Sequence, residues 1–434
     1  MLNARETRVE RQSKMLLNGK CIICFTMNIA GPYKISSVVE KAFDEGMNRI
    51  VNMLKVYGIS PLKTDVYKEI TGVEGYISVN ADSDKIKRLM VQIEDTFPLG
   101  RLFDIDVIKS NGEKVSRSDI NMAGRRCMIC ESEGAACARS RKHSVEELQQ
   151  HFIDTICNYF NNEYADFLAQ QAVKSLLYEV AVTPKPGLVD RIDNGAHRDM
   201  DFYTFIDSAV CLYDYFKKCA LIAIEESELS LNQIFEKLRY LGISAEEKMY
   251  NNTNGVNTHK GAVFSFGLTV ASAAYLYENS EKITIDNVLN TCAKMAKYSL
   301  ADFENQDEHM SFGKKAFAKH NVKGARGQAA AGYPDVKTAF MFLRECILKG
   351  DDVNTAGAKT LCLLMTLVED TNIIKRSDIQ TLKKVQTAAK QILNKEDVVL
   401  SINQLNQEFI KQNISPGGCA DLLAMCFLLN FICE

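Results

Sequence analysis

Hydrophobic and polar positions follow two different patterns along the 434-residue chain. Up to about residue 150, short apolar runs bounded by Gly and Pro alternate with amphipathic stretches, which is typical of buried strands and packed helices. From there to residue 434, apolar residues recur almost continuously at helical spacing. The change predicts a multi-domain α+β protein, in which a mixed α/β domain over residues 1–145 precedes a larger all-α domain over residues 146–434.

The N-terminal pattern predicts three strands and two helices. The first strand is a short apolar run bounded by Gly, and the helices carry apolar residues three and four positions apart. The predicted strands cover Lys20–Ile29, Glu74–Val79 and Arg101–Ile108, and the predicted helices cover Ser36–Tyr57 and Asp82–Phe97.

The helical part begins with a capping box, in which Ser144 is followed three residues later by Glu147. The uncharged run Gly261–Tyr277 contains Ser, Thr and Gly and is slightly short for a bilayer, so we expect a buried helix there. The other predicted helices cover Leu148–Val182, Phe202–Ala223, Leu231–Leu241, Ile285–Leu300, Thr338–Leu348, Thr355–Glu369 and Ala420–Ile432.

Composition narrows the class of protein. With 46% hydrophobic and 25% charged residues, a largely disordered or fibrous chain is excluded. A net charge of −3 gives no electrostatic reason to expect a nucleic acid or an anionic membrane as partner. The 14 cysteines are scattered, and residues 1–20 lack the apolar core of a signal peptide. We therefore expect a reduced, cytoplasmic protein.

Paired acids provide the first candidate site. In the predicted strand Arg101–Ile108, strand alternation places Asp104 and Asp106 on one face and apolar residues on the other. Two such carboxylates can hold Mg²⁺, which in turn grips phosphates, and this arrangement resembles that of the nucleotidyltransferase superfamily. Paired acids on the exposed face of a strand are also common, and the Gly-rich turn that such enzymes place upstream is not evident.

A cysteine-rich connector provides the second candidate. Cys127 and Cys130 form a C-x₂-C pair that Cys137 and His143 follow, and these four residues can close a tetrahedral zinc site. The alternative is a reduced cysteine cluster on a linker. The C-x₂-C pair at Cys21 lies within an apolar strand, so we expect it to belong to the core.

A loop that contains two of the seven prolines follows the first long helix. Its prolines and glycine fix a non-helical path, and its ionisable side chains suit a phosphate- and metal-binding site. These side chains belong to Glu179, Lys185, Asp190, Arg191, His197 and Asp199.

Three further segments carry candidate groups. Asn257, His259 and Lys260 precede the uncharged helix, where helix-start amides form an anion site or a polar cap. Arg326 lies among glycines, as in a mobile lid loop. Asp370 ends an apolar helix, where it either binds a cation or belongs to a solvated helix end.

These motifs together resemble two known families. Residues from about 155 to 434 resemble the triphosphoribosyl-dephospho-CoA synthases, and residues 1 to about 150 resemble the apo-citrate lyase phosphoribosyl-dephospho-CoA transferases, also called holo-citrate lyase synthases. The synthase-like motifs are Thr183–Asp190, Gly195–Met200, Gly255–Gly261, Gly324–Arg326 and Ser415–Gly418. The transferase-like motifs are Phe25–Pro32, Lys34, Phe43–Gly46, Pro98–Val107, Arg126–Cys127, Cys137–Ser140 and His143–Ser144.

The resemblance implies a fusion that makes and attaches one prosthetic group. In the helical domain, the 2′-hydroxyl of dephospho-CoA attacks C1 of the ribose of ATP, and adenine leaves. In the first domain, a serine of the citrate lyase acyl carrier protein attacks the α-phosphate of that product, and pyrophosphate leaves. The expected small molecules are ATP, dephospho-CoA and Mg²⁺, with Zn²⁺ possible in the connector.

The candidate residues fit these two steps. Asp104 and Asp106 suit the metal of the transfer, with Lys34 and Arg101 at the leaving pyrophosphate. For the synthesis, the acids Glu179, Asp190, Asp199 and Asp370 are candidates for base and Mg²⁺ ligands, and no one of them is singled out as the base. The candidates for holding ATP or assisting adenine are Lys185, Arg191, His197, Asn257, His259, Lys260 and Arg326.

Two other functions remain open on the sequence. In the first, only the helical domain is catalytic, as a sugar–nucleobase hydrolase or transferase. In the second, the N-terminal domain is a zinc-stabilised module on which the carrier protein docks.

Overall fold

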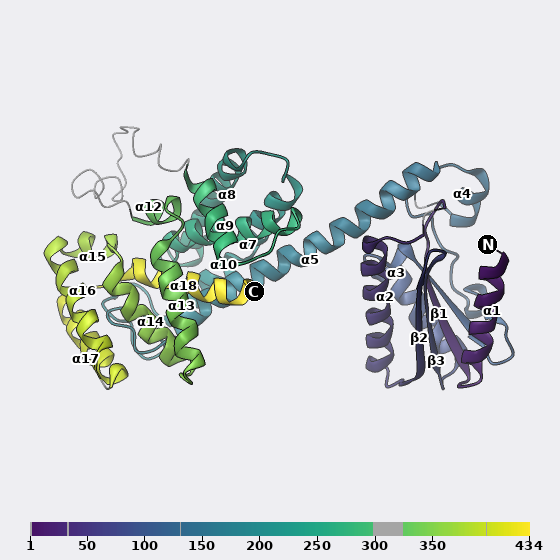
Figure 1. Ribbon diagram of the computed structural model, residues 1–434, viewed down its shortest axis with the longest axis horizontal. Coiled ribbons are helices and arrows are strands. Elements are labelled where there is room, and N and C mark those ends of the chain that lie inside the picture. Colours follow the sequence, from purple (N-terminus) through teal and green to yellow (C-terminus); the bar gives the residue numbers. More distant parts are fainter. Residues whose placement is uncertain (1, 33, 131, 298–323, 396) are drawn as a thin grey trace. The chain divides into compact units, whose positions relative to one another are not determined.

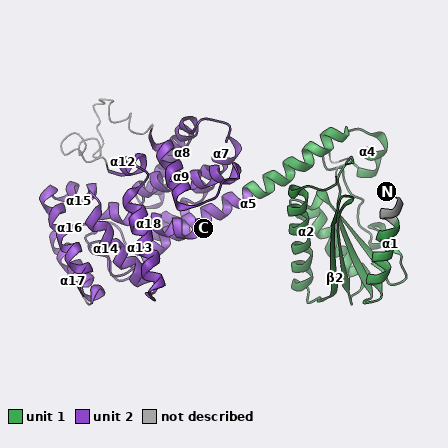
Figure 2. Ribbon diagram, in the orientation of Figure 1, with its two compact units in different colours: residues 1–161 green, residues 162–434 purple. Residues whose placement is uncertain are grey.

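The computed structural model describes residues 2–32, 34–130, 132–297, 324–395 and 397–434. Contacts divide the chain into two compact units, unit 1 over residues 1–161 and unit 2 over residues 162–434 (Figure 2). The chain is thus multi-domain, with a sheet in unit 1 and helices in unit 2 (Figure 1). Among the described residues, no helix combines the length and the apolar character needed to cross a membrane.

Unit 1 contains a five-stranded sheet in which every pairing is antiparallel. The strands are β1 (Cys21–Met27), β2 (Pro61–Glu69), β3 (Gly72–Val79), β4 (Phe103–Lys109) and β5 (Lys114–Val115). Their spatial order is β2-β3-β1-β4-β5, so β1 lies at the centre of the sheet, between β3 and β4.

Helices cover both faces of this sheet (Figure 1). The helices of unit 1 are α1 (Leu2–Leu16), α2 (Ser37–Val56), α3 (Ser83–Thr96) and α4 (Gly134–Ser140). On one face, Phe25 of β1 stacks on Phe43 of α2 with ring centroids 4.9 Å apart. On the other face, Met15 of α1 packs against Cys24 and Tyr76. The alternation of the strands therefore fills two separate apolar layers.

Unit 2 consists of helices. They are α5 (Val145–Ala181, which begins in unit 1), α6 (Phe202–Cys211), α7 (Tyr213–Glu225), α8 (Leu231–Asn252), α9 (Lys260–Glu278), α10 (Ile285–Ala296), α12 (Gly324–Ala330), α13 (Pro334–Leu348), α14 (Val353–Leu367), α15 (Thr371–Arg376), α16 (Ile379–Leu393), α17 (Val398–Gln412) and α18 (Gly417–Ile432).

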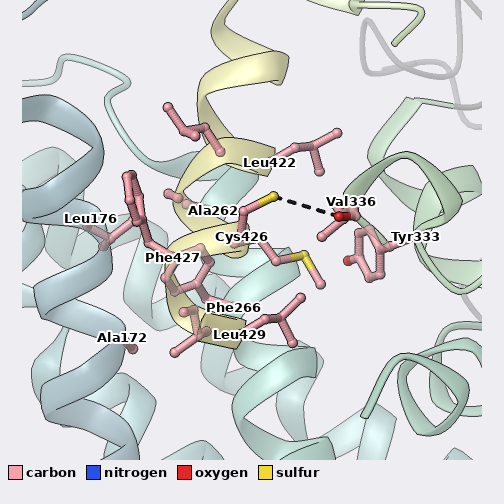
Figure 3. Close-up of a cluster of buried hydrophobic side chains, with 14 of the residues drawn as sticks. Ala172, Leu176, Ala262, Phe266, Tyr333, Val336, Leu422, Cys426, Phe427 and Leu429 are labelled. Carbon is pink, nitrogen blue, oxygen red and sulfur yellow. Dashed lines mark hydrogen bonds between the residues drawn. The ribbon is translucent and has the colours of Figure 1, made fainter. Parts of the chain in front are cut away.

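The apolar helices α9 and α18 form the centre of unit 2. Both are buried nearly all round, as expected of helices whose sequences are apolar on every face. Figure 3 shows Phe427 of α18 beside Leu176 of α5, while Cys426 faces the carbonyl of Val336 on α13 at 3.8 Å. The expectation of a buried helix at Gly261–Tyr277 is confirmed.

Most elements expected from the pattern are present, including the strand at residues 103–109 and the capping box. Ser144 accepts from the amide of Glu147 at 3.1 Å, and the Glu147 carboxylate accepts from the amide of Ser144 at 2.8 Å. The pattern did not predict β2, because its side chains are mostly exposed on an edge strand and show no apolar alternation. It also did not predict helices α1, α16 and α17.

Two expectations are wrong. The stretch expected as one helix over Phe202–Ala223 is interrupted at Leu212, which ends α6 and starts α7. The expected lid loop around Arg326 is helix α12, because Ala-rich residues follow Gly324 and bury Ala329 in the core of unit 2. The end of the helix predicted to reach Leu300 lies outside the described residues.

We predict that Gly46→Ala destabilises unit 1. A Cβ at Gly46 would lie 2.4 Å from Cζ of Phe25, whose ring is fixed between Phe43 and Phe103. Overpacking costs about 1–3 kcal/mol and outweighs the gain of about 1 kcal/mol in helix propensity. Hydrogen exchange of β1 and β3 should show a lower opening free energy, whereas the exposed control Asn48→Ala should not; unchanged protection in Gly46→Ala would refute the close packing.

Candidate active sites

The paired acids of unit 1 lie on one face of strand β4. Phe103, Ile105 and Val107 point into the apolar layer under α2 and α3, so Asp104 and Asp106 face the opposite side. Their backbones pair with Thr26 and Cys24 of β1. The predicted alternation is therefore confirmed, and it leaves two carboxylates two residues apart outside the core.

Both carboxylates have a cationic neighbour. An Nη atom of Arg125 lies 3.1 Å from Oδ1 of Asp104, and Nζ of Lys114 lies 2.6 Å from Oδ1 of Asp106. Partial burial, and then the charge of Asp106, raise the pKa of the Asp104 carboxyl. Two oxygen donors whose mutual repulsion a cation would relieve suit Mg²⁺.

A recess of about 930 Å³ has Arg125 in its wall, whereas Asp104 and Asp106 are not among its lining residues. It is large enough for a nucleotide-sized ligand, and its wall is rich in cations. Arg101, Arg125, Arg126 and Arg141 line it together with Asn28 of the predicted transferase motif. Lys34 is not among the lining residues, since its ammonium donates to the carbonyl of Ile29.

The connector cysteines converge on the same recess. The ligand atoms of Cys127, Cys130, Cys137 and His143 all lie within 4.8 Å of one another. Three of these residues also line the recess, Cys130 being the exception. By contrast, Cys21 and Cys24 are buried within the sheet, as expected of core cysteines.

In unit 2, Asp190 organises the proline-containing loop. Its Oδ2 accepts from the hydroxyl of Thr183 at 2.7 Å and from the amide of Lys185 at 3.1 Å. Its Oδ1 accepts from the amides of Ile192 and Asp193. The carboxylate thus satisfies four donors of its own loop, which holds the loop in one conformation.

The same loop buries an ion pair. Nζ of Lys185 donates to the carboxylate of Glu179, and both side chains are at most 5% exposed. Burial raises the pKa of Glu179, and the charge of Lys185 opposes the rise. A buried ammonium and carboxylate remain charged only as a pair, so each fixes the other.

Two further acids lie at the starts of helices. Asp370 caps α15 through the amide of Asn372 at 2.8 Å, and it also accepts from the amide of Cys419 in the first turn of α18 at 2.9 Å. Because Asp370 is 1% exposed, the solvated helix end is excluded. A Cβ at Gly418 would lie 3.0 Å from Oδ2 of Asp370, so the glycine admits the carboxylate.

Asp421 belongs to α18, and its carboxylate lies against the start of α9. A Cβ at Gly261 would lie 2.0 Å from its Oδ2, so only glycine leaves room there. Burial, followed by the charges of Glu179 and Asp370, raises the pKa of Asp421 well above its ordinary value, and the amide of Ala262 opposes the rise. The electrostatic coupling links three acids from different parts of the sequence into one cluster.

His259 precedes α9 and is 3% exposed. Burial, and then the charge of Lys185, lower its pKa to about 3, so the imidazole is neutral. The hydroxyl of Thr258 donates to Ser208 at 2.6 Å, and Ser208 lies 2.7 Å from Nδ1 of His259. This series of hydrogen bonds assigns the ring proton of His259 to Nε2, which is buried without a partner among the described residues.

A second histidine lies at the other end of the loop. Nε2 of His197 lies 2.9 Å from the hydroxyl of Ser415, and Nδ1 lies 3.1 Å from the guanidinium of Arg376. Burial and the charge of Arg376 lower the pKa of His197 to about 4. Asp199 approaches this imidazole only to 3.8 Å and is exposed. The synthase-like motifs around His197 and Ser415 therefore meet in space.

The other predicted residues lie at the surface or at helix ends. Lys260 pairs with Glu246 at 2.6 Å, and Asn257 accepts from the amide of Lys260 at 3.3 Å. Arg191 donates to Asn354 at 3.0 Å. Arg326 lies in α12, after the residues that the structure leaves undescribed.

Sequence reasoning missed Asp421 and Arg376 as candidate site residues. Asp421 is the only charged residue of the apolar segment 417–432, and such an isolated acid was the available signal. Tyr333 was also missed. It is fully buried with a hydroxyl that has no partner among the described residues, and its pKa is raised by burial first and, to a smaller extent, by the charge of Asp421.

Comparison with known proteins matches both units. Residues 165–434 match the family model CitG, described as ATP:dephospho-CoA triphosphoribosyl transferase. Residues 1–159 match the model CitX, described as apo-citrate lyase phosphoribosyl-dephospho-CoA transferase.

Several curated proteins are similar to this chain. A protein named CitXG from Haemophilus influenzae is 32% identical, covering 99% of this chain and 95% of its own length. A CitXG protein from Leuconostoc mesenteroides is 31% identical, with 99% and 96% covered. A probable 2-(5''-triphosphoribosyl)-3'-dephosphocoenzyme-A synthase from Streptococcus mutans is 40% identical over 61% of this chain and 96% of its own length. The chain therefore belongs to the family of fused CitX–CitG transferases, with the CitX part in unit 1 and the CitG part in unit 2.

Proposed function

We propose that unit 2 makes triphosphoribosyl-dephospho-CoA from ATP and 3′-dephospho-CoA and that unit 1 transfers the phosphoribosyl-dephospho-CoA arm to a serine of the citrate lyase acyl carrier protein. The observation that carries the proposal is the carboxylate pair Asp104 and Asp106 beside a recess lined by arginines. A site for a polyanion and a metal at carboxylates that solvent can reach suits transfer to a protein serine better than simple docking does.

In unit 1, the serine hydroxyl attacks the α-phosphate and pyrophosphate leaves. Asp104 and Asp106 are the residues that would hold Mg²⁺, and the pair gives this unit its likeness to nucleotidyltransferases. When bound, the ion supplies charge neutralisation at the phosphate oxygens. Arg101 and Arg126 line the recess and are placed to bind the leaving pyrophosphate. Lys34 stays a weaker candidate, because its ammonium is used by the carbonyl of Ile29.

In unit 2, the 2′-hydroxyl of dephospho-CoA attacks C1 of the ribose of ATP while adenine leaves. We assign the base to Asp421, whose carboxylate lies at the start of α9 beside Glu179 and Asp370, because its raised pKa makes its carboxylate a stronger base than an exposed one. Glu179 and Asp370 complete the acidic cluster and would hold Mg²⁺. Asp190, which the sequence offered as a base, fits better as the residue that fixes the loop, since its oxygens already accept four hydrogen bonds.

The neutral His259 fits the departure of adenine. Its Nε2–H has no partner among the residues that the structure describes, and such a buried donor can bond a ring nitrogen of the leaving base. The guanidinium of Arg376 beside His197 offers charge for the triphosphate, with Arg191, Lys260 and Arg326 as further cations. Asn257 and Asp199 stay candidates for polar contacts with the nucleotide.

We predict that Asp104→Asn abolishes attachment and spares synthesis. The amide keeps the size of the side chain but removes one anionic ligand, so labelling of the acyl carrier protein should fall about 100-fold or more. Mass spectrometry of the carrier protein, with adenine release measured in the same reaction, separates the two steps. The control Asp65→Asn, at a partly exposed acid of edge strand β2 that pairs with Lys63, should label normally. Normal labelling by Asp104→Asn would refute the metal role.

We predict the opposite pattern for Asp421→Asn. Loss of the base should lower adenine release by about 100-fold or more, while carrier labelling from supplied triphosphoribosyl-dephospho-CoA stays normal. Asp214→Asn, at an exposed acid of α7 that pairs with Lys248, is the matched control. Wild-type adenine release in Asp421→Asn would assign the base to another acid of the cluster.

We predict that His259 contributes no ionisation to the pH profile of adenine release. With a pKa of about 3 it is neutral above about pH 5 and gains a proton only far below that. His259→Asn should therefore lower kcat/KM about 10- to 100-fold through the lost donor, with the shape of the profile unchanged between about pH 5.5 and 8. Disappearance of an acidic limb in this variant would show that His259 titrates during the reaction.

A further inference from the structure

We propose that Cys127, Cys130, Cys137 and His143 bind a structural Zn²⁺ ion that fixes the arginine-bearing segment 124–144 as a wall of the recess in unit 1. Binding of the ion is independent of the reaction assigned to the unit, whereas its effect on transfer rests on the proposed function. The two parts are tested by separate measurements.

The geometry of the four residues matches a tetrahedral site. All four ligand atoms lie within 4.8 Å of one another, and Sγ of Cys130 is 3.9 Å from Sγ of Cys137. Zinc–sulfur bonds of about 2.3 Å in a tetrahedron place two sulfurs about 3.8 Å apart. A disulfide would require a separation of about 2.05 Å, so the two thiols are not bonded to each other, and their spacing fits two ligands of one tetrahedral ion.

The imidazole supplies a second observation. Nε2 of His143 is buried and has no hydrogen-bond partner among the described residues. An unpaired buried nitrogen costs free energy that a metal bond would recover. Three thiols and one imidazole are also a donor set that zinc prefers, and they fill all four positions, which is typical of a structural ion.

The surrounding segment has little else to hold it. Of the described residues between 124 and 144, only Cys137 is buried. The local hydrogen bonds are those of the short helix α4 and of a tight turn, in which the amide of Cys127 donates to the carbonyl of Ser132 at 2.7 Å and the amide of Gly134 donates to the carbonyl of Arg125 at 2.8 Å. A segment that lacks an apolar core needs another source of order, and a bound ion supplies it.

Structural order in this segment matters for transfer because its arginines are adjacent to the proposed zinc ligands. Arg125 and Arg126 directly precede Cys127 and line the recess. Arg125 also donates to Asp104 at 3.1 Å and to the carbonyl of Phe103. Fixing the turn at Cys127 therefore fixes a guanidinium against the carboxylate pair, so the ion acts on transfer through positioning.

The first experiment measures zinc in the purified full-length protein by elemental analysis. We expect about one zinc per chain in the wild type and less than a tenth of that in Cys130→Ser/Cys137→Ser. Cys157→Ser, which changes an exposed cysteine of α5 outside the cluster, is the control and should keep its zinc. A zinc-free wild type that also fails to take up added Zn²⁺, or equal zinc content in the double variant, would overturn the site.

A second measurement guards against misfolding of the double variant. The wild type reconstituted with Co²⁺ should show the absorption of a tetrahedral thiolate complex, and a spectrum of an octahedral ion would overturn the ligand set. Formation of a Cys130–Cys137 disulfide without metal uptake, detected by mass spectrometry, would assign the cluster to redox chemistry instead.

The effect on transfer is measured with the same proteins. In the zinc-free double variant, carrier labelling from supplied triphosphoribosyl-dephospho-CoA should fall at least about 10-fold, and adenine release by unit 2 should stay at the wild-type rate. Loss of zinc with normal labelling would refute the positioning role alone. Failure of the wild type to label the carrier protein would instead refute the proposed function and leave the zinc result standing.

Discussion

The helical unit depends on burying carboxylates at the starts of its helices. Asp370 accepts from amides in the first turns of α15 and α18, and Asp421 occupies the start of α9. A carboxylate taken out of water loses several kcal/mol of hydration, and helix-start amides replace part of it. Glycine is therefore required at Gly261, where a Cβ would lie 2.0 Å from an oxygen of Asp421, and it relieves close packing at Gly418, where a Cβ would lie 3.0 Å from an oxygen of Asp370. The close packing at these helix starts and the charge of the carboxylates thus favour the same small residues there.

The two units solve one electrostatic problem with local means. The chain has a net charge of −3, so its overall field does not attract ATP or a triphosphorylated product. Individual Arg and Lys side chains are instead held at the proposed binding sites. In unit 1 the turn before Cys127 brings Arg125 to Asp104, and in unit 2 the loop between α5 and α6 buries Lys185 against Glu179. In both units, the cation is therefore positioned by the turn or loop of the backbone from which its side chain extends.

The sequence predicted those parts whose pattern is local. Alternation placed Asp104 and Asp106 on one face of a strand, and the capping box marked the start of α5. Edge strand β2 was missed because exposed side chains leave no apolar pattern. Asp421 was missed as a site residue for a different reason: its environment comes from α9 and from Glu179 on α5, far away in the sequence. Burial and electrostatic coupling of this kind appear only in three dimensions.

Differences in exposure between the sites follow from the chemistry proposed for each unit. Adenine departure leaves an electron-poor C1 that water would also attack, so that step requires a site from which water is excluded. His259, Lys185 and Asp370 are at most 3% exposed. Transfer to the carrier protein requires the reverse, because a serine on another protein must reach the phosphate. The side chain of Asp104 is 48% exposed and that of Asp106 is 29% exposed. Their exposure leaves the proposed metal site open to a protein substrate, and on this proposal the segment that bears Arg125 is the part that must be held in place.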